Sequence, residues 1–181
     1  MKKLIIAAAI VCTAAFVQAA SVGWTNMGLA AYNGDKYQMF VIGQKGVASV
    51  ATVTALLDAG SSADAYAFGG GTIANGLASL TPSASGPQIA ETGTYTAFMV
   101  LFDAATPVAG TTKYAVLEGG LNGTGFTKEI GGTTASITFM GGNAASMITA
   151  DSWKTYGAPE PTSGVLLLLG VAGLALKRRR A

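Results

Sequence analysis

The stretch TYTAFMVLF, residues 94–102, decides the fold class. It places β-branched and aromatic side chains on both faces, which is typical of a strand that is buried on both sides. A second stretch, residues 134–140, alternates apolar Ala135, Ile137 and Phe139 with small polar residues and predicts a half-exposed strand. Weaker strand signals cover residues 28–32, 37–42 and 114–117. We expect a small, mainly antiparallel β-sandwich or roll.

One segment also fits a helix. Residues 47–59 place Val50, Val53 and Leu57 on one helical face and end at Gly60, a suitable C-cap residue. The valine and threonine content of the segment favours a strand instead. We expect one helix here, packed on the sheet.

The expected turns follow the glycines. Asn33-Gly34 and Asn122-Gly123 suit two-residue hairpin turns, in which both central residues need positive φ. Asn75-Gly76 and the Gly69–Gly71 run read as ordinary loop, because they lie in one glycine-rich stretch. Residues 80–93, with two prolines, predict a long surface loop before the central strand.

Charge divides the 181 residues into a mildly acidic body and two basic ends. Lys2 and Lys3 begin the chain, and Lys177, Arg178, Arg179 and Arg180 nearly end it. Residues 20–157 hold five lysines and eight acidic residues, so the body is mildly acidic. A nucleic-acid-binding domain needs a basic patch in its folded part, so we expect no nucleic-acid partner.

The N-terminus has the form of a secretion signal. Lys2 and Lys3 precede an apolar run over residues 4–17, and small residues follow at the expected cleavage site. We expect signal peptidase to cut after Ala19 or, as the alternative, after Ala20; an uncleaved anchor is the other interpretation. The chain has a single cysteine, Cys12, which lies in this segment, and no histidine, so the exported body has neither.

That composition excludes several chemistries. Ser-His-Asp, Cys-His and ordinary zinc sites need residues that the body lacks, so we expect no enzyme activity, metal or cofactor. A pair of carboxylates remains possible for a hydrolase, and Asp58 with Asp64 is a weak calcium candidate. Trp24 and Trp153 could form a sugar-stacking platform, while residues 52–54 and 94–96 resemble short threonine rows of ice binders.

The C-terminus combines a stiff tripeptide, an apolar run and a basic end. Pro159, Glu160 and Pro161 stay extended, because each proline fixes φ and restrains the residue before it. Residues 163–176 carry no charge and as a helix would reach roughly 21 Å, short of the ~30 Å hydrocarbon core. Lys177 to Arg180 tend to stay on the cytoplasmic side. These features predict a transient membrane helix with a retention charge.

Taken in order, this tail resembles the PEP-CTERM sorting signal. The resemblance covers residues 158–181 and includes the PEP tripeptide, Gly170, Gly173 and the basic cluster. It implies an exported bacterial protein that lodges in the inner membrane, is processed by an exosortase and reaches the cell surface or extracellular matrix. Such cargo often accompanies exopolysaccharide and biofilm production, and the tail is sometimes labelled an ice-binding protein C-terminal domain.

The sequence therefore predicts three segments: a signal peptide (1–19), an exported mainly-β domain (20–157) and the sorting signal (158–181). The expected function is that of a non-enzymatic surface or extracellular-matrix protein. Two alternatives stay open for the body, a carbohydrate- or ice-binding module and a secreted hydrolase that uses carboxylates.

Overall fold

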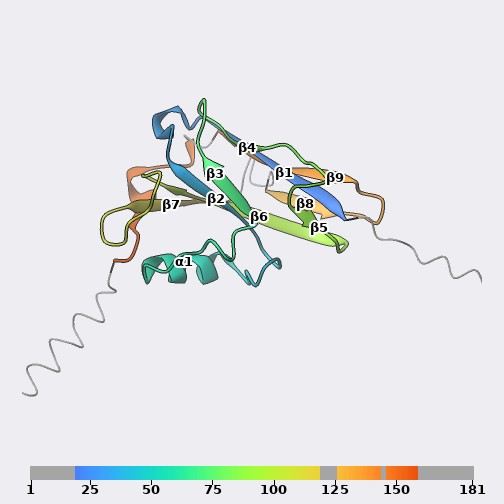
Figure 1. Ribbon diagram of the computed structural model, residues 1–181, viewed down its shortest axis with the longest axis horizontal. Helices are drawn as coiled ribbons and strands as arrows, with labels where there is room; N and C mark the ends of the chain where they lie inside the picture. Colours follow the sequence, from blue (N-terminus) through green and yellow to red (C-terminus); the bar gives the residue numbers. More distant parts are fainter. Residues whose placement is uncertain (1–18, 119–125, 144–145, 159–181) are drawn as a thin grey trace, which may run out of the picture.

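The computed structural model describes residues 19–118, 126–143 and 146–158. Two β-sheets pack face to face, and one α-helix lies on the outer face of the larger sheet (Figure 1). The smaller sheet consists of β1 (Ala20–Met27), β4 (Ala78–Leu80), β5 (Gln88–Ile89) and β9 (Ser136–Asn143). The larger sheet consists of β2 (Lys36–Val41), β3 (Gly69–Thr72), β6 (Gly93–Phe102), β7 (Lys113–Leu117), β8 (Thr127–Ile130) and β10 (Trp153–Thr155). The helices are α1 (Val50–Asp58) and the short 3-10 turns η1 (Ala30–Tyr32) and η4 (Ala150–Ser152).

Strand β6 is the centre of the larger sheet, as its sequence predicts. Its second half pairs with β2 on one side and β7 on the other, and its first half pairs with β8. All six residues 97–102 are buried. Residues that are apolar on both faces fit this place, because β6 contributes to a core on each side of its sheet.

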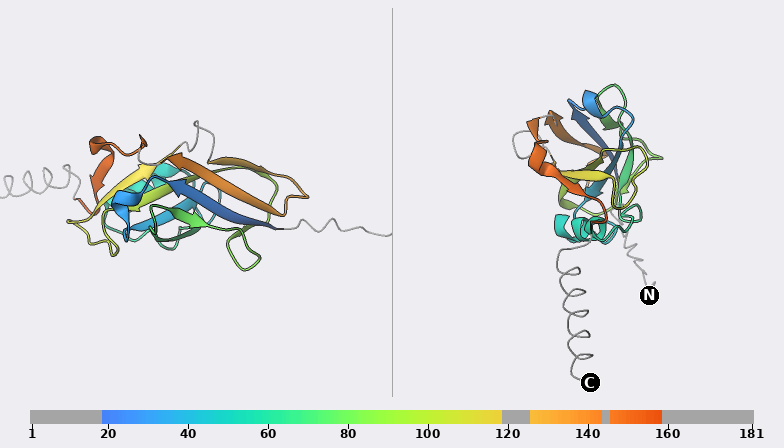
Figure 2. Two further views of the ribbon diagram at one scale, coloured as in Figure 1. Left: turned by 90° about the horizontal axis from the view of Figure 1, so that it is seen from above. Right: turned by 90° about the vertical axis from the view of Figure 1, so that its left-hand side faces the viewer.

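The protein has two hydrophobic cores, one between the sheets and one between the larger sheet and α1, and alternate side chains of strand β2 belong to each. Tyr37, Met39 and Val41 point between the two sheets. Phe40 points the other way, stacks on Phe98 at 5.1 Å between ring centroids and is covered by the helix. The predicted helix is confirmed: α1 buries Val53 and Leu57 against this second core. Figure 2 shows from the end of the molecule that α1 covers one side of the sandwich only.

The pairing of the described strands is mainly antiparallel, as expected, with one exception in the smaller sheet. Strands β1 and β9 run parallel, from Ser21 opposite Ser136 to Met27 opposite Asn143, so this sheet is mixed. Strand β1 itself was not predicted. The alternation predicted for residues 134–140 is confirmed at Ile137 and Phe139, whereas Ala135 is exposed and precedes the strand.

The hairpin turn that the sequence predicted at Asn33-Gly34 is found instead at Asn75-Gly76. Asn33-Gly34 forms a type II turn, with φ of −58° and +91°, after η1 rather than after a strand, so the expectation of a strand at residues 28–32 is wrong. Asn75-Gly76 has positive φ at both residues, and Ala74 and Leu77 exchange both backbone hydrogen bonds across it, as in a type I′ hairpin. The two turns bind each other, because the Asn33 Oδ1 accepts a hydrogen bond of 2.8 Å from the Gly76 N–H. Asn122-Gly123 lies outside the described residues.

The glycine run is an edge strand, β3, and not the expected loop. A Cβ on Gly69 would lie 2.2 Å from a ring atom of Trp24, and one on Gly70 would lie 2.5 Å from the Tyr37 carbonyl oxygen. Glycine is therefore needed at both positions for close packing. The expected loop at residues 80–93 is confirmed apart from the two-residue strand β5 and the two end residues, which belong to β4 and β6.

Within the described ranges, no helix has the length and apolar character needed to cross a membrane. The apolar run at residues 163–176 and the signal segment at residues 1–18 lie outside those ranges.

Candidate functional site

A polar hollow lies on the outer face of the larger sheet, beside the area that α1 covers. Lys36 and Gln38 share a face of β2 with the buried Phe40, but the helix does not extend over them. The hollow has a volume of about 580 Å³, and the backbone of Gly69–Gly71 forms part of its wall. A smaller hollow of about 200 Å³ adjoins it and is lined by Leu57 and Tyr156 among others.

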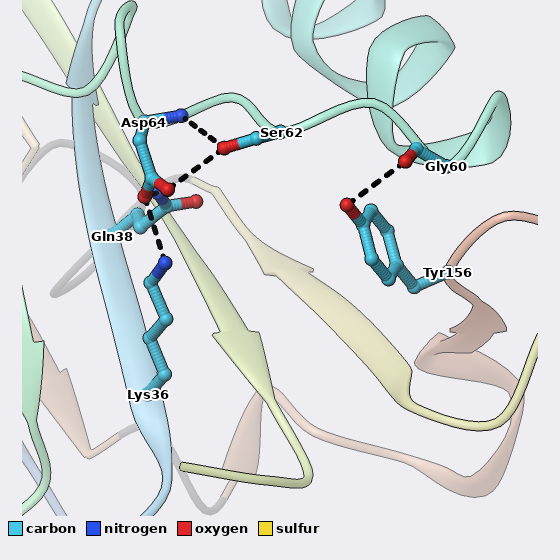
Figure 3. A network of polar contacts seen from close by, with 6 residues as sticks. All are labelled: Lys36, Gln38, Gly60, Ser62, Asp64 and Tyr156. Atoms are coloured by element: carbon cyan, nitrogen blue, oxygen red, sulfur yellow. Dashed lines mark hydrogen bonds and ion pairs between the residues drawn. The ribbon is translucent and has the colours of Figure 1, made fainter. Parts of the chain in front are cut away.

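The carboxylate of Asp64 is the centre of the polar contacts in this hollow (Figure 3). Lys36 Nζ lies 2.7 Å from Oδ1, and Gln38 Nε2 donates to the same oxygen. Ser62 Oγ donates to Oδ2 at 2.8 Å and accepts from the Asp64 N–H at 3.2 Å. The hydrogen bond from Lys36, followed by that from Ser62, holds the pKa of the Asp64 carboxyl below its ordinary value. Asp64 is thus a fixed anion in an ion pair.

Gln38 carries the unusual feature of the site. Its side chain is buried, with 3% of the residue exposed, and its Oε1 has no hydrogen-bond partner among the described residues. The amide donates to Asp64 through its nitrogen, and Figure 3 shows the oxygen turned away from the carboxylate. A buried acceptor without a partner costs about 1–3 kcal/mol. The site therefore has an unused acceptor beside an ion pair.

The carboxylates do not form the pairs considered from the sequence. Asp58 accepts a hydrogen bond of 2.5 Å from Tyr114, whose pKa is raised by burial and by this bond, whereas Asp64 is bound by Lys36 and Ser62. Asp58 and Asp64 therefore bind different partners and do not share a site, as the calcium interpretation required. No group of three or more acidic residues gathers as a metal site in the part of the chain that the structure describes.

One other acidic pair is close enough to interact. Burial, and secondly the charge of Asp103, raise the pKa of Asp35. Asp103 Oδ1 accepts from the Lys113 N–H at 2.6 Å, so this carboxylate caps a turn between β6 and β7. Sequence reasoning did not single out this pair, because the two residues are far apart along the chain.

The residues considered for sugar stacking and for ice binding also lie apart from one another in the fold. Trp24 is 2% exposed and fills the core between the sheets, while Trp153 is half-buried and packs at 5.7 Å against Tyr32. The threonines of residues 52–54 lie on α1, and those of residues 94–96 lie on β6. No shared row of exposed aromatic or threonine side chains is formed by these candidates.

The C-terminal end of the body is firmly attached. Tyr156 is 9% exposed, donates from its hydroxyl to the Gly60 carbonyl at 3.0 Å and exchanges backbone hydrogen bonds with Gly110 and Thr112. The Gly157 N–H donates to the Leu57 carbonyl at 2.8 Å. Hydrogen bonds to other segments therefore extend as far as Gly157, and the Ala158 N–H donates to the nearby Thr155 carbonyl at 3.3 Å. The predicted sorting residues Pro159, Glu160 and Pro161 and the basic residues Lys177 to Arg180 lie outside the described residues.

The N-terminal end reaches the predicted cleavage site. Ala20 is fully buried and begins β1, opposite Ile89 of β5. Ala19, the residue before it, is half-buried and lies outside the strand.

Comparison with known families settles the nature of the tail. The model of the PEP-CTERM protein-sorting motif matches residues 158–181. The chain carries a PEP-CTERM sorting motif. The resemblance predicted from the sequence is confirmed, and the motif implies exosortase-dependent sorting of an exported protein to the cell surface. The PEP-CTERM motif begins at Ala158, whose N–H still donates to the Thr155 carbonyl at 3.3 Å. No curated protein and no solved structure matches the chain.

Proposed function

We propose that the body, residues 20–157, is a non-enzymatic protein of the cell surface or extracellular matrix, released from its two end segments by signal peptidase and exosortase. The PEP-CTERM motif at residues 158–181 carries this proposal. The inner membrane holds the chain only in transit.

The extent of the fold supports the proposed cuts. Strand β1 begins at Ala20, and the last backbone hydrogen bonds that join the C-terminal end to other segments involve Tyr156 and Gly157. Removal of residues 1–19 and of the tail would leave every described strand intact. A cut after Ala19 leaves all of β1 in the product, whereas a cut after Ala20 removes a fully buried residue.

The polar hollow offers no general acid at its central carboxylate. Asp64 is held as an anion by Lys36, so it is a poor general acid at neutral pH. The body contains no histidine or cysteine that could serve as an alternative acid, base or nucleophile.

Intact-mass measurement of the protein from the envelope and from the medium tests the proposal. We expect a product that begins at Ala20 and has lost Lys177 to Arg180. A Glu160→Gln variant is expected to keep its tail, while Glu129→Gln, at an exposed position on β8, serves as the matched control. A surface protein that retains its basic end would contradict the proposal.

A second candidate function, saccharide binding, is favoured by the unused acceptor of Gln38. A ligand anion without a proton cannot donate to Oε1, and a cation would be repelled by Lys36 and Lys45, both of which line the larger hollow. A neutral hydroxyl both donates and accepts, so a sugar unit suits this mixture of groups best.

Saccharide binding is testable by titration calorimetry with glucose, galactose and glucuronate. We expect Asp64→Ala to weaken binding and Asp151→Ala, on a different surface, to leave it unchanged. Absence of binding by all three sugars, or equal loss in both variants, would contradict this candidate.

A further inference from the structure

The polar hollow and the smaller hollow beside it meet at one group of side chains. Lys36, Gln38 and Asp64 line both of them (Figure 3). The larger one, with about 580 Å³, has a volume within the range of roughly 300–1,000 Å³ that is usual for small-molecule pockets in proteins. The ion pair and the buried amide therefore lie where the two hollows join.

Charge is unevenly distributed around the larger hollow. Two lysines and one acid line it: Lys36, Lys45 and Asp64. Lys36 is paired with Asp64 at 2.7 Å. Lys45 Nζ donates to the Ala67 carbonyl at 2.8 Å and has no carboxylate partner among the described residues. One positive charge is therefore uncompensated at the hollow, although the body as a whole is mildly acidic.

Lys45 has a backbone conformation that lysine rarely adopts. Its φ is +47°, in the left-handed region. Backbone hydrogen bonds between Val41 and Gln44 and between Gly43 and Val47 hold this turn. Glycine adopts such a conformation with less strain, and strained residues of other types gather at ligand sites. The strain indicates that the turn needs the lysine side chain itself.

The hollow thus asks for two kinds of group in one ligand. Gln38 Oε1 is a buried acceptor without a partner among the described residues and requires a hydroxyl donor. Because Oε1 itself is covered, the amide must turn toward the hollow when a hydroxyl binds. The Lys45 ammonium group requires an anion, for which a carboxylate is well suited. A sugar acid carries hydroxyls and a carboxylate on one ring.

We propose that the polar hollow binds an acidic sugar, a uronate unit whose hydroxyls bind Gln38 and Asp64 and whose carboxylate binds Lys45. This inference rests on the saccharide-binding candidate above and names the class of sugar. The wall formed by Gly69–Gly71 has no side chains, so a sugar ring can approach its backbone closely.

Two ligands that differ only in charge test the preference for an acid. Titration calorimetry of the full-length protein in detergent compares glucuronate with its neutral amide, glucuronamide. We expect glucuronate to bind about tenfold more tightly, because only its carboxylate forms a charge-assisted hydrogen bond with Lys45. Equal affinities would overturn the inference. Acetate that binds as tightly as glucuronate would also overturn it, since the hollow would then be a simple anion site.

Lys45→Met tests the residue that carries the preference. The variant keeps an unbranched side chain but removes the ammonium group, so glucuronate should bind no more tightly than glucuronamide. Lys154→Met is the matched control, since Lys154 is an exposed lysine on β10 that does not line the hollow. It should keep the tenfold preference. A preference that persists in Lys45→Met, or disappears in both variants, would contradict the role of Lys45.

Lys45→Gly keeps the test valid if Lys45→Met is unstable. Glycine adopts the positive φ of this turn without strain, so the fold should be retained in thermal unfolding. The variant should bind glucuronate and glucuronamide equally. A remaining preference for glucuronate would overturn the inference.

Gln38→Met gives the complementary result. It removes the unused acceptor, so both sugars should bind more weakly, by about tenfold, while the preference for glucuronate is kept. Unchanged affinity for both sugars would exclude the amide from the site and overturn the inference.

The outcomes separate this inference from the proposals on which it rests. If neither glucuronate nor glucuronamide binds, saccharide binding fails, and the acid preference fails with it. If both bind equally, only the acid preference fails. The proposed surface location is decided by intact mass and does not depend on either result.

Discussion

The two ends of the folded body are attached in different ways. The N-terminal end is the start of β1, a strand that has β9 on one side and β4 and β5 on the other. The C-terminal end is β10, a three-residue strand that, among the described strands, pairs with β7 alone and is followed by Tyr156. Figure 1 shows these two ends at opposite ends of the molecule.

This difference predicts different roles in stability. A central strand contributes contacts to the whole core between the sheets, whereas an edge strand with one inserted ring secures its immediate surroundings. Damage to β1 should therefore unfold the body, and damage near Tyr156 should first release the segment that leads to the sorting motif.

The largest effect is expected for Trp24→Ala in β1. Trp24 is buried, packs over Gly69 and donates from its ring nitrogen to the Tyr37 hydroxyl at 3.3 Å. Removal of such a ring costs about 3–5 kcal/mol, a large part of the stability of a typical domain. Urea unfolding followed by circular dichroism measures this loss. A cost below about 1 kcal/mol would show that β1 is not central to stability.

Tyr156→Ala should cost somewhat less, about 3 kcal/mol, because the ring is buried at the edge of the second core. Its effect should be local: backbone amides of residues 153–157 are expected to exchange hydrogen faster than those of β1. Tyr156→Phe is the matched control, since it removes only the hydroxyl bond to Gly60, and should cost about 1 kcal/mol. Uniform acceleration of exchange throughout the body would contradict a local role.

Gly157→Ala tests the C-terminal attachment by adding a single methyl group to it. Gly157 has φ of +69°, and the added Cβ would lie 2.7 Å from Ala109, so strain and overpacking add to about 1–3 kcal/mol. Gly110→Ala is the matched control, because its φ is +82° but nothing lies within 4 Å of the new atom. We expect the smaller loss at Gly110 in thermal unfolding. Equal losses would mean that backbone conformation alone explains both.

The smallest effects are expected at two acids whose pKa values shift in opposite directions. The lowered pKa of Asp64 means that its contribution to stability is present above its ordinary value of 3.8 and is lost as the pH falls through the lower folded value. Asp64→Asn should therefore destabilise the protein at neutral pH and have no effect in strong acid. The Asp64 side chain is 62% exposed, so the loss should stay under about 1 kcal/mol.

Asp35 should behave in the opposite way. Its raised pKa means that the folded state favours the protonated acid, so stability decreases as the pH rises through the interval above 3.8. Asp35→Asn should therefore stabilise the protein at neutral pH and lose this advantage below about pH 3. Urea midpoints measured across the pH range check both variants. The same sign for Asp35→Asn and Asp64→Asn at neutral pH would contradict these assignments.

Local sequence signals were sufficient where the deciding pattern lies within one short segment. Residues 94–102 are apolar on both faces and become β6, and the spacing of Val53 and Leu57 becomes the buried face of α1. The resemblance of the tail was equally readable, because the sorting motif is a linear pattern. In each case the information lies in adjacent residues.

Signals failed where distant contacts determine local structure. Gly69–Gly71 reads as a loop but forms β3, since Trp24 and the backbone of Tyr37 occupy the space that side chains would need. Asn33-Gly34 and Asn75-Gly76 carry the same dipeptide but form different turns, and a hydrogen bond joins the two turns across 43 positions of the chain. The polar hollow was missed for the same reason, because Lys36 and Asp64 meet only after folding.

By itself, the sequence determined the mainly-β class, the mildly acidic body and the sorting motif, because composition and linear motifs are properties of neighbouring residues. For residues 47–59 it favoured a helix but also fitted a strand, and packing against the second core decided between them. Only the tertiary structure decided the parallel pairing of β1 with β9, the hollow around Gln38 and Asp64, and the rigid attachment at Tyr156. Each of these depends on which strands become neighbours, and that choice is made by packing of the whole core.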